Sequence, residues 1–220
     1  MMNAIRTLAF LLLLPLLAAC ADDPAVANTP AFEATPQADD GIGTLEPLAA
    51  TTEPDSPFEA DAPPPARSPD VIYVPTPQPV VDAMLELAKV GPDDILYDLG
   101  SGDGRIPVTA AKEFGIRAVG IDINPARILE ANANAEEAGV TDKVTFIEGD
   151  LFEANISEAT VVTLYLLQSL NVKLRPKLLS ELRPGTRIVS HAFDMANEWE
   201  PEETREVDGA MIYLWTVPER

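Results

Sequence analysis

A short apolar run that ends in three closely spaced glycines constrains the fold of this chain more than any other feature. Residues 95–99 are mostly apolar, as expected for a strand that is covered on both faces of a parallel sheet. Gly100, Gly102 and Gly104 follow, and apolar residues then recur at helical spacing over 106–114. Because glycine allows a positive φ and a close ligand, and a helix start presents free N–H groups, the stretch predicts a ligand-binding turn between strand and helix.

Acidic residues mark the ends of three successive predicted strands. Asp98 lies just before the glycine turn, Asp122 ends the apolar run 118–121, and Asp150 follows a third strand. Parallel strands bring their carboxyl ends to one edge of a sheet, where a carboxylate can accept two hydrogen bonds from a ribose diol. Each acid by itself is equally typical of a turn or helix cap, but together they predict a nucleoside site.

The rest of the chain alternates between strand and helix patterns, which predicts an α/β, Rossmann-like, doubly wound and mostly parallel sheet. Three prolines at alternate positions exclude a helix over 71–79, and Asp208-Gly209 is typical of a hairpin turn. Strands are expected at 95–99, 117–122, 143–148, 159–166 and 187–193, with a hairpin over 205–217. Helices are expected at 80–90, 105–114, 125–138 and 168–182, the last one disturbed at Pro176.

The glycine spacing separates two ligand classes. A dinucleotide fingerprint needs glycine or alanine at position 105, which is arginine here, and this disfavours a nicotinamide oxidoreductase. The stretch from Asp98 to Gly104 instead resembles motif I of the class I S-adenosylmethionine-dependent methyltransferases. That resemblance implies S-adenosylmethionine as cofactor and an antiparallel last strand. The cofactor-binding residues it implies are Asp98, Gly100, Ser101, Gly102, Gly104, Asp122, Ile123, Asp150, Leu151 and Thr76, with Asp122 on the ribose and Asp150 on the adenine amino group.

More distantly, the chain resembles the mitochondrial seven-strand lysine methyltransferases. The matching elements are the opening segment 74–77 and the motif I stretch 100–105. The resemblance implies that Thr76 and Tyr73 close over the methionine end of the cofactor. Methyltransferases of nucleobases carry Asn/Asp-Pro-Pro-aromatic after the fourth strand, and this chain lacks that signature at 165–171. We therefore expect N-methylation of an amine, either a protein lysine or a small amine.

Candidate catalytic residues lie near the ends of the fourth and fifth strands. Tyr165 is suited to orienting or desolvating an amine, although it is equally suited to core packing. His191, the single histidine of the chain, is a candidate base or binding residue, but a structural hydrogen bond explains it as well. Gln168 and Asn171 either bind the acceptor or cap the following helix. In-line methyl transfer requires no metal, and none is expected.

The sequence of the N-terminal region predicts export of the protein and a lipid anchor. Residues 1–19 have the proportions of a signal peptide, and residues 17–20, Leu-Ala-Ala-Cys, resemble a bacterial lipobox, which implies lipidation of Cys20. An ordinary signal peptide or an uncleaved anchor is the alternative. Residues 21–66 hold ten acidic residues, nine prolines and no lysine or arginine, so 20–66 is expected to be a disordered tether and 67–220 the methyltransferase domain. Cys20 is the only cysteine, which excludes an internal disulfide.

The charge of the chain bears on its partners. The net charge is −21, and 67–220 alone carries 26 acidic and 14 basic residues. A negative net charge argues against nucleic acid as a binding partner and suits a basic protein or an amine as the substrate. A lipobox places the domain on the periplasmic side of the envelope, whereas S-adenosylmethionine is cytoplasmic. The expectations therefore include a cytoplasmic enzyme, if the lipobox is misread, and a non-catalytic nucleoside-binding or scaffold lipoprotein of the envelope.

Overall fold

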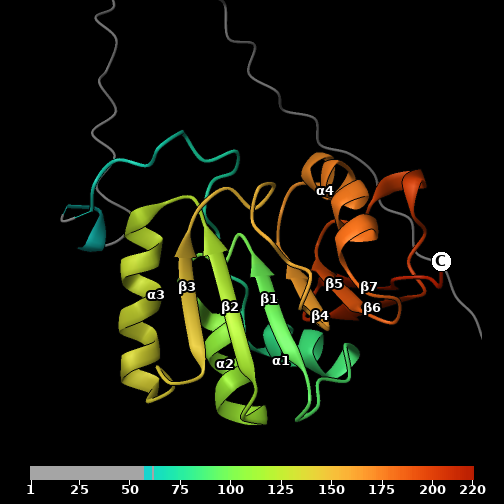
Figure 1. Ribbon diagram of the computed structural model, residues 1–220, viewed down its shortest axis with the longest axis horizontal. Coiled ribbons are helices and arrows are strands. Elements are labelled where there is room, and N and C mark those ends of the chain that lie inside the picture. The colour runs from blue at the N-terminus through green and yellow to red at the C-terminus, as the bar shows by residue number, and fades with distance from the viewer. Residues whose placement is uncertain (1–56, 61) are drawn as a thin grey trace, which may run out of the picture. The chain divides into compact units, whose positions relative to one another are not determined.

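The computed structural model describes residues 57–60 and 62–220, and Figure 1 shows a seven-stranded sheet flanked by helices. The strand order is β3-β2-β1-β4-β5-β7-β6, parallel except for β7, which runs antiparallel to both β5 and β6. The strands are β1 (Ile95–Leu99), β2 (Arg117–Asp122), β3 (Val144–Glu148), β4 (Val161–Leu164), β5 (Arg187–His191), β6 (Glu203–Val207) and β7 (Ala210–Thr216). The helices are η1 (Pro57–Ala60), α1 (Gln78–Leu87), α2 (Arg105–Phe114), α3 (Pro125–Ala138), α4 (Gln168–Glu181) and η2 (Ala196–Glu198).

The predicted doubly wound sheet with an antiparallel last strand is confirmed. Local sequence signals determine where several helices and strands begin or end. Asn124 caps α3 by accepting a hydrogen bond from the Ala126 N–H, and Pro125 occupies its first turn, where its missing N–H costs no helical hydrogen bond. At the other end of the sheet, Asp208 and Gly209 both have positive φ, as a tight hairpin turn between twisted strands requires.

One helix prediction was wrong in its bounds. The helix expected at 80–90 spans Gln78–Leu87, and it begins earlier because Pro79 lies in the first turn, where proline is tolerated. The helix expected at 168–182 spans Gln168–Glu181 with Pro176 inside it, and a disturbance at Pro176 stays a prediction. Within the range predicted as a disordered tether, Pro57–Ala60 form the 3-10 helix η1, which contacts α3.

Two apolar clusters cover the two faces of the sheet. On one face, α1, α2 and α3 pack through residues such as Met84, Ala110 and Ala135 against Leu96 and Ala118. On the other face, α4 and the segment after β3 pack against residues of β1, β4 and β5. Trp215 is fully buried there. Burial of the central strands on both faces leaves the carboxyl edge as the place where polar residues meet.

The predicted signal peptide, Cys20 and most of the tether lie outside the described residues. Among the residues that the structure describes, no helix has both the length and the apolar character that a membrane crossing requires.

Candidate active site

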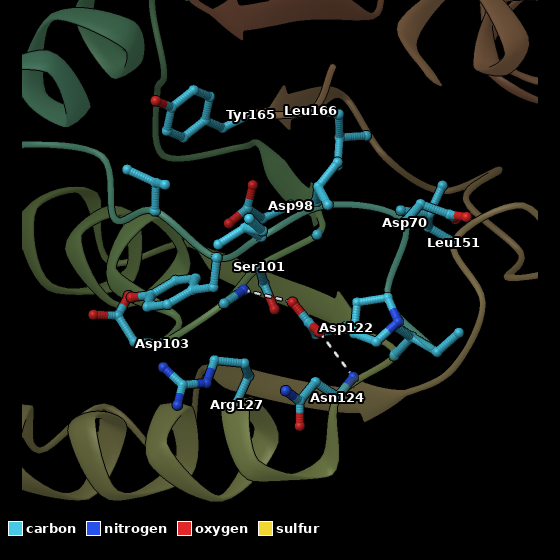
Figure 2. Close-up of a pocket in the computed structure, with 18 of the residues that line it drawn as sticks. Asp70, Asp98, Ser101, Asp103, Asp122, Asn124, Arg127, Leu151, Tyr165 and Leu166 are labelled. Carbon is cyan, nitrogen blue, oxygen red and sulfur yellow. Dashed lines mark hydrogen bonds between the residues drawn. The ribbon is translucent and has the colours of Figure 1, made fainter. Parts of the chain in front are cut away.

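A cavity of about 790 Å³ lies at the carboxyl edge of the parallel strands, and its volume is in the range of small-molecule and cofactor sites. Figure 2 shows Asp98, Ser101 and Asp122 near its centre, with Tyr165 toward one side and Leu151 toward the other. Of the predicted site residues, ten line the cavity: Thr76, Asp98, Gly100, Ser101, Gly102, Asp122, Ile123, Asp150, Leu151 and Tyr165. Gly104 and His191 do not border it.

The glycine turn forms the floor of the cavity. The N–H groups of Gly100 and Ser101 both donate to the carbonyl of Ile121, which ties the turn to β2. Gly100 and Gly102 have φ values of 85° and 52°, in the left-handed region that glycine adopts freely. Gly104 also has positive φ, but its role is packing, since a Cβ there would lie 2.3 Å from the Phe146 ring. The turn therefore needs glycine for its backbone and for close approach.

Asp98 is the most deeply buried of the three acids. Its side chain is enclosed at the end of β1, and the Thr163 hydroxyl donates to its Oδ1 at 2.8 Å. Burial raises the pKa of Asp98 to about 8, because the hydrogen bond from Thr163 only partly offsets desolvation, while Asp122 and Asp103 add repulsion. Near neutral pH this carboxyl therefore holds a proton that a positively charged ligand would displace.

Asp122 and Asp150 lie at the ends of β2 and β3. Both Asp122 oxygens accept backbone hydrogen bonds, from Gly102 N–H at 2.8 Å and Asn124 N–H at 2.9 Å (Figure 2). Burial raises the pKa of Asp122, and these backbone bonds counteract the rise. Each oxygen keeps a second lone pair for a ligand hydroxyl. At Asp150 the hydrogen bonds from Phe152 N–H and Arg67 outweigh the opposing effect of partial burial and lower its pKa.

Residues 67–76, which we call the cover segment, lie across the cavity and line it over much of their length. Arg67 pairs with Asp150 at 3.0 Å, and the Thr76 carbonyl accepts from Arg105 at 2.9 Å. Between these ends, the Tyr73 ring covers Gly102, where a Cβ would lie 2.4 Å from it. Tyr73 and Thr76 thus both line the cavity, and their closure over the methionine end of the cofactor stays a prediction. The side chain of Tyr73 occupies part of the hollow over Gly102, and the cavity extends beside it.

Arg67 and Arg127 belong to the site but were not singled out from the sequence. Arg127 is almost fully buried at the start of α3, with its guanidinium 4.6 Å from the centre of the Tyr73 ring and 2.9 Å from Glu130. Arg67 is 83 positions away from its partner Asp150. Neither residue lies in a local motif, so the sequence held no signal for them.

The Tyr165 side of the cavity is mostly apolar. Tyr165 lines it together with Leu166, Leu167, Leu170 and Phe193. His191 lies behind Tyr165, with the two ring centres 3.9 Å apart. Within the described part of the chain, no group of three or more His, Cys, Asp or Glu side chains is arranged to hold a metal ion.

Asn171 and Gln168 stay outside the cavity and support its wall. Asn171 is completely buried and donates from Nδ2 to the Ser190 hydroxyl and to the Phe193 carbonyl, at 3.1 and 2.9 Å. Gln168 donates to Asp194. Both side chains therefore hold the loop after β5, which carries Phe193 into the wall of the cavity.

The residues around the cavity fit S-adenosylmethionine. Gly100 and Gly102 border the cavity with backbone alone, and the carboxyl groups of Asp98, Asp122 and Asp150 provide oxygen acceptors for hydroxyl and amino groups. When bound, the cofactor supplies an electrophilic methyl group; the protein supplies position and desolvation. Asp122 and the glycine turn both line the cavity, and their contacts with the ribose and with the rest of the cofactor stay predictions.

Comparison with known proteins identifies methyltransferases that are similar to this chain. The ANTKMT methyltransferase domain family matches residues 98–203. A protein-lysine N-methyltransferase from Saccharolobus islandicus is 54% identical over 156 residues, 69% of this chain and 96% of the relative. An adenine nucleotide translocase lysine N-methyltransferase from Mus musculus is 36% identical over 122 residues, 55% of this chain and 52% of the relative.

Solved structures of methyltransferases are also similar, and one of them has high sequence identity. It is described as an RNA methyltransferase from Salinibacter ruber in complex with S-adenosyl-L-homocysteine, and it is 60% identical with a TM-score of 0.65. The match covers 67% of this chain and 95% of that one. Fold, cavity and relatives agree, so the chain belongs to the class I S-adenosylmethionine-dependent methyltransferases and is related to the protein-lysine methyltransferases among them.

Proposed function

We propose that this methyltransferase transfers the methyl group to the side-chain amine of a lysine in a protein. The observation that carries the proposal is the 54% identity to a protein-lysine N-methyltransferase across nearly its whole length. The absence of the Asn/Asp-Pro-Pro-aromatic signature at 165–171 and the excess of acidic residues in 67–220 point the same way.

The apolar side of the cavity suits this acceptor. A lysine must lose its proton before its nitrogen can attack, and a free lysine has a pKa of about 10.4. Leu166, Leu167 and Phe193 disfavour a charged ammonium and lower the pKa of an amine that enters. We assign the orientation of that amine to Tyr165, because this residue lines the cavity beside the apolar side chains.

RNA is the second candidate acceptor, because the solved structure at 60% identity is described as an RNA methyltransferase. The acidic balance of the domain disfavours it, since RNA binding relies on basic contacts to phosphate. Incubation of the full-length protein with methyl-labelled S-adenosylmethionine and separate protein and RNA fractions of a cell extract distinguishes the two. Label in a protease-sensitive, RNase-resistant fraction and methyllysine on mass spectrometry are expected.

Two results would contradict the lysine proposal. Label confined to RNase-sensitive material would assign the activity to RNA, and label on another amino acid would change the acceptor. Gly102→Val serves as the cofactor-site control, because position 102 has positive φ and no space for a side chain beneath the Tyr73 ring.

We also propose that the enzyme is held at the envelope through a lipidated Cys20. The support is the lipobox-like sequence 17–20 followed by an acidic, proline-rich stretch. Metabolic labelling with palmitate and membrane fractionation of wild type and Cys20→Ala test it. Label and membrane association should both disappear in the variant; an unlabelled wild type in the soluble fraction would overturn the proposal and favour a cytoplasmic enzyme.

A further inference from the structure

A buried contact joins three elements beside the cavity: the cover segment, the end of β4 and the end of β5. Thr76 Oγ1 and His191 Nδ1 are 3.1 Å apart, and the His191 ring lies 3.9 Å from the Tyr165 ring, tilted by 35°. Thr76 and His191 are each 4% exposed. Thr76 and Tyr165 line the cavity, whereas His191 does not. The His191 ring therefore reaches the site through these two neighbours, while its backbone carbonyl accepts a hydrogen bond from the N–H of Phe193, a third lining residue, at 2.9 Å.

The neighbours belong to different sides of the site. Thr76 ends the cover segment, which reaches Asp150 through Arg67 and covers Gly102 with Tyr73. Tyr165 belongs to the apolar side that we assign to the acceptor. The His191 ring thus lies between the cover segment and the apolar side of the cavity, in contact with both.

His191 is suited to this contact as a neutral side chain. Burial lowers the pKa of His191 from its usual value of 6.5, and burial is the only cause of that shift among the described residues. Thr76 faces the ring from the cover segment, and Tyr165 faces it from the end of β4. A neutral imidazole has one donor and one acceptor nitrogen, and the Thr76 hydroxyl can pair with either.

We propose that His191 is a positioning residue with two contacts. Through Thr76 it holds the cover segment over the cofactor, and through Tyr165 it holds the apolar side of the cavity, where we place the acceptor. It touches neither substrate and transfers no proton. Because one ring makes both contacts, the two functions can be separated by substitution. Loss of the hydrogen bond should act on cofactor binding, and loss of the ring should act on use of the acceptor.

Binding of S-adenosyl-L-homocysteine to the full-length protein, measured by calorimetry, tests the first contact without any acceptor. Thr76→Val and His191→Phe should each weaken binding by about three- to tenfold, the effect of one hydrogen bond. The double variant should bind no more weakly than either single one, because both changes remove the same bond. Thr76→Ser should bind like wild type, and Thr204→Val, an exposed threonine on β6, is the matched control.

The second contact is tested with His191→Asn. Asparagine keeps a polar atom near the position of Nδ1 but removes the ring, so cofactor affinity should stay close to wild type while the acceptor KM rises several-fold. This arm alone rests on the proposed lysine acceptor. Failure to find that acceptor would leave the binding results standing, and the two failures are therefore distinguishable.

NMR provides a readout that a merely structural role would not move, because His191 is the only histidine in the chain. In the tag-free protein its imidazole nitrogens give one unambiguous signal set. We expect a single neutral tautomer at pH 6.5, a shift of these signals when S-adenosyl-L-homocysteine binds, and a changed tautomer balance in Thr76→Val. Circular dichroism and thermal melts confirm that each variant is folded.

Several results would overturn the proposal. The first is an imidazole signal that changes neither when the ligand binds nor in Thr76→Val. The second is additive effects in the double variant. The third is that His191→Asn and His191→Phe match wild type in both cofactor affinity and acceptor KM. If His191→Phe does not fold, the comparison of Thr76→Val with Thr76→Ser tests the same hydrogen bond through its other partner.

Discussion

Asp98 should release a proton when the cofactor binds. The carboxyl is buried at the centre of the site, and its pKa of about 8 keeps it largely protonated near neutral pH. S-adenosylmethionine carries a sulfonium and an ammonium charge, and a cation beside a carboxyl favours its ionised form. Binding should therefore shift Asp98 to the carboxylate.

The size of the effect follows from that pKa. With a pKa of about 8, about nine-tenths of the Asp98 carboxyls are protonated at pH 7, so binding should release up to about 0.9 proton. Below pH 8 each pH unit costs about 1.4 kcal/mol in ionising the group. Affinity should consequently rise up to about tenfold per unit as the pH increases from 6 to 8, and then level off.

Calorimetric titration with S-adenosylmethionine at pH 7, in buffers of different ionisation enthalpy, measures the released protons directly. Asp98→Asn is the matched variant, because its side-chain oxygen can still accept the hydrogen bond from Thr163. It should bind more weakly and with little dependence on pH. Equal heats in all buffers for the wild type, or the same proton release in Asp98→Asn, would refute the reasoning.

Three further outcomes are expected. Because the pKa of Asp98 is raised from 3.8 to about 8, the contribution of this group to the free energy of unfolding is complete below pH 3.8 and is lost as the pH rises toward 8. Asp98→Asn should therefore stabilise the cofactor-free protein against urea at pH 8.5 by at least about 1 kcal/mol more than it does at pH 5. An equal effect at both pH values would contradict this reasoning. Gly104→Ala should lower the free energy of unfolding in urea by about 2–4 kcal/mol, because the new Cβ would lie 2.3 Å from Phe146 and 2.8 Å from Ala131. Gly115→Ala is the control: position 115 has a similar φ but open space, so the cost should be only about 1 kcal/mol. Equal costs would show that packing at position 104 is unimportant. Asn171→Leu should cost about 1–3 kcal/mol, because it removes the Nδ2 donor to the Ser190 hydroxyl and the Phe193 carbonyl, which then keep only the hydrogen bond from Ser190 to Phe193. The exposed Asn132→Leu should stay within about 0.5 kcal/mol, and thermal melts that rank the two variants the other way would exclude the supporting role of Asn171.

The sequence by itself determined the order of elements and the centre of the cofactor site. Short-range signals were enough: an apolar run before the glycine turn, Asn124-Pro125 at the start of α3, and Asp208-Gly209 between β6 and β7. Because the strands are parallel, acids at three strand ends had to meet at one edge. The placement of Asp98, Asp122 and Asp150 around one cavity was therefore predictable without coordinates.

Only the tertiary structure decided which distant residues complete the site. Thr76 and His191 are 115 positions apart, and Arg67 and Asp150 are 83 apart, so no local pattern relates them. The path of the cover segment depends on packing of Tyr73 against Gly102 and Arg127, which periodicity cannot express. The same holds for His191: spacing placed it at a strand end, but the neighbouring ring and hydroxyl put it behind the cavity wall. Hydrogen bonds and ring contacts depend on distances of a few ångströms, and the folded chain alone sets those distances.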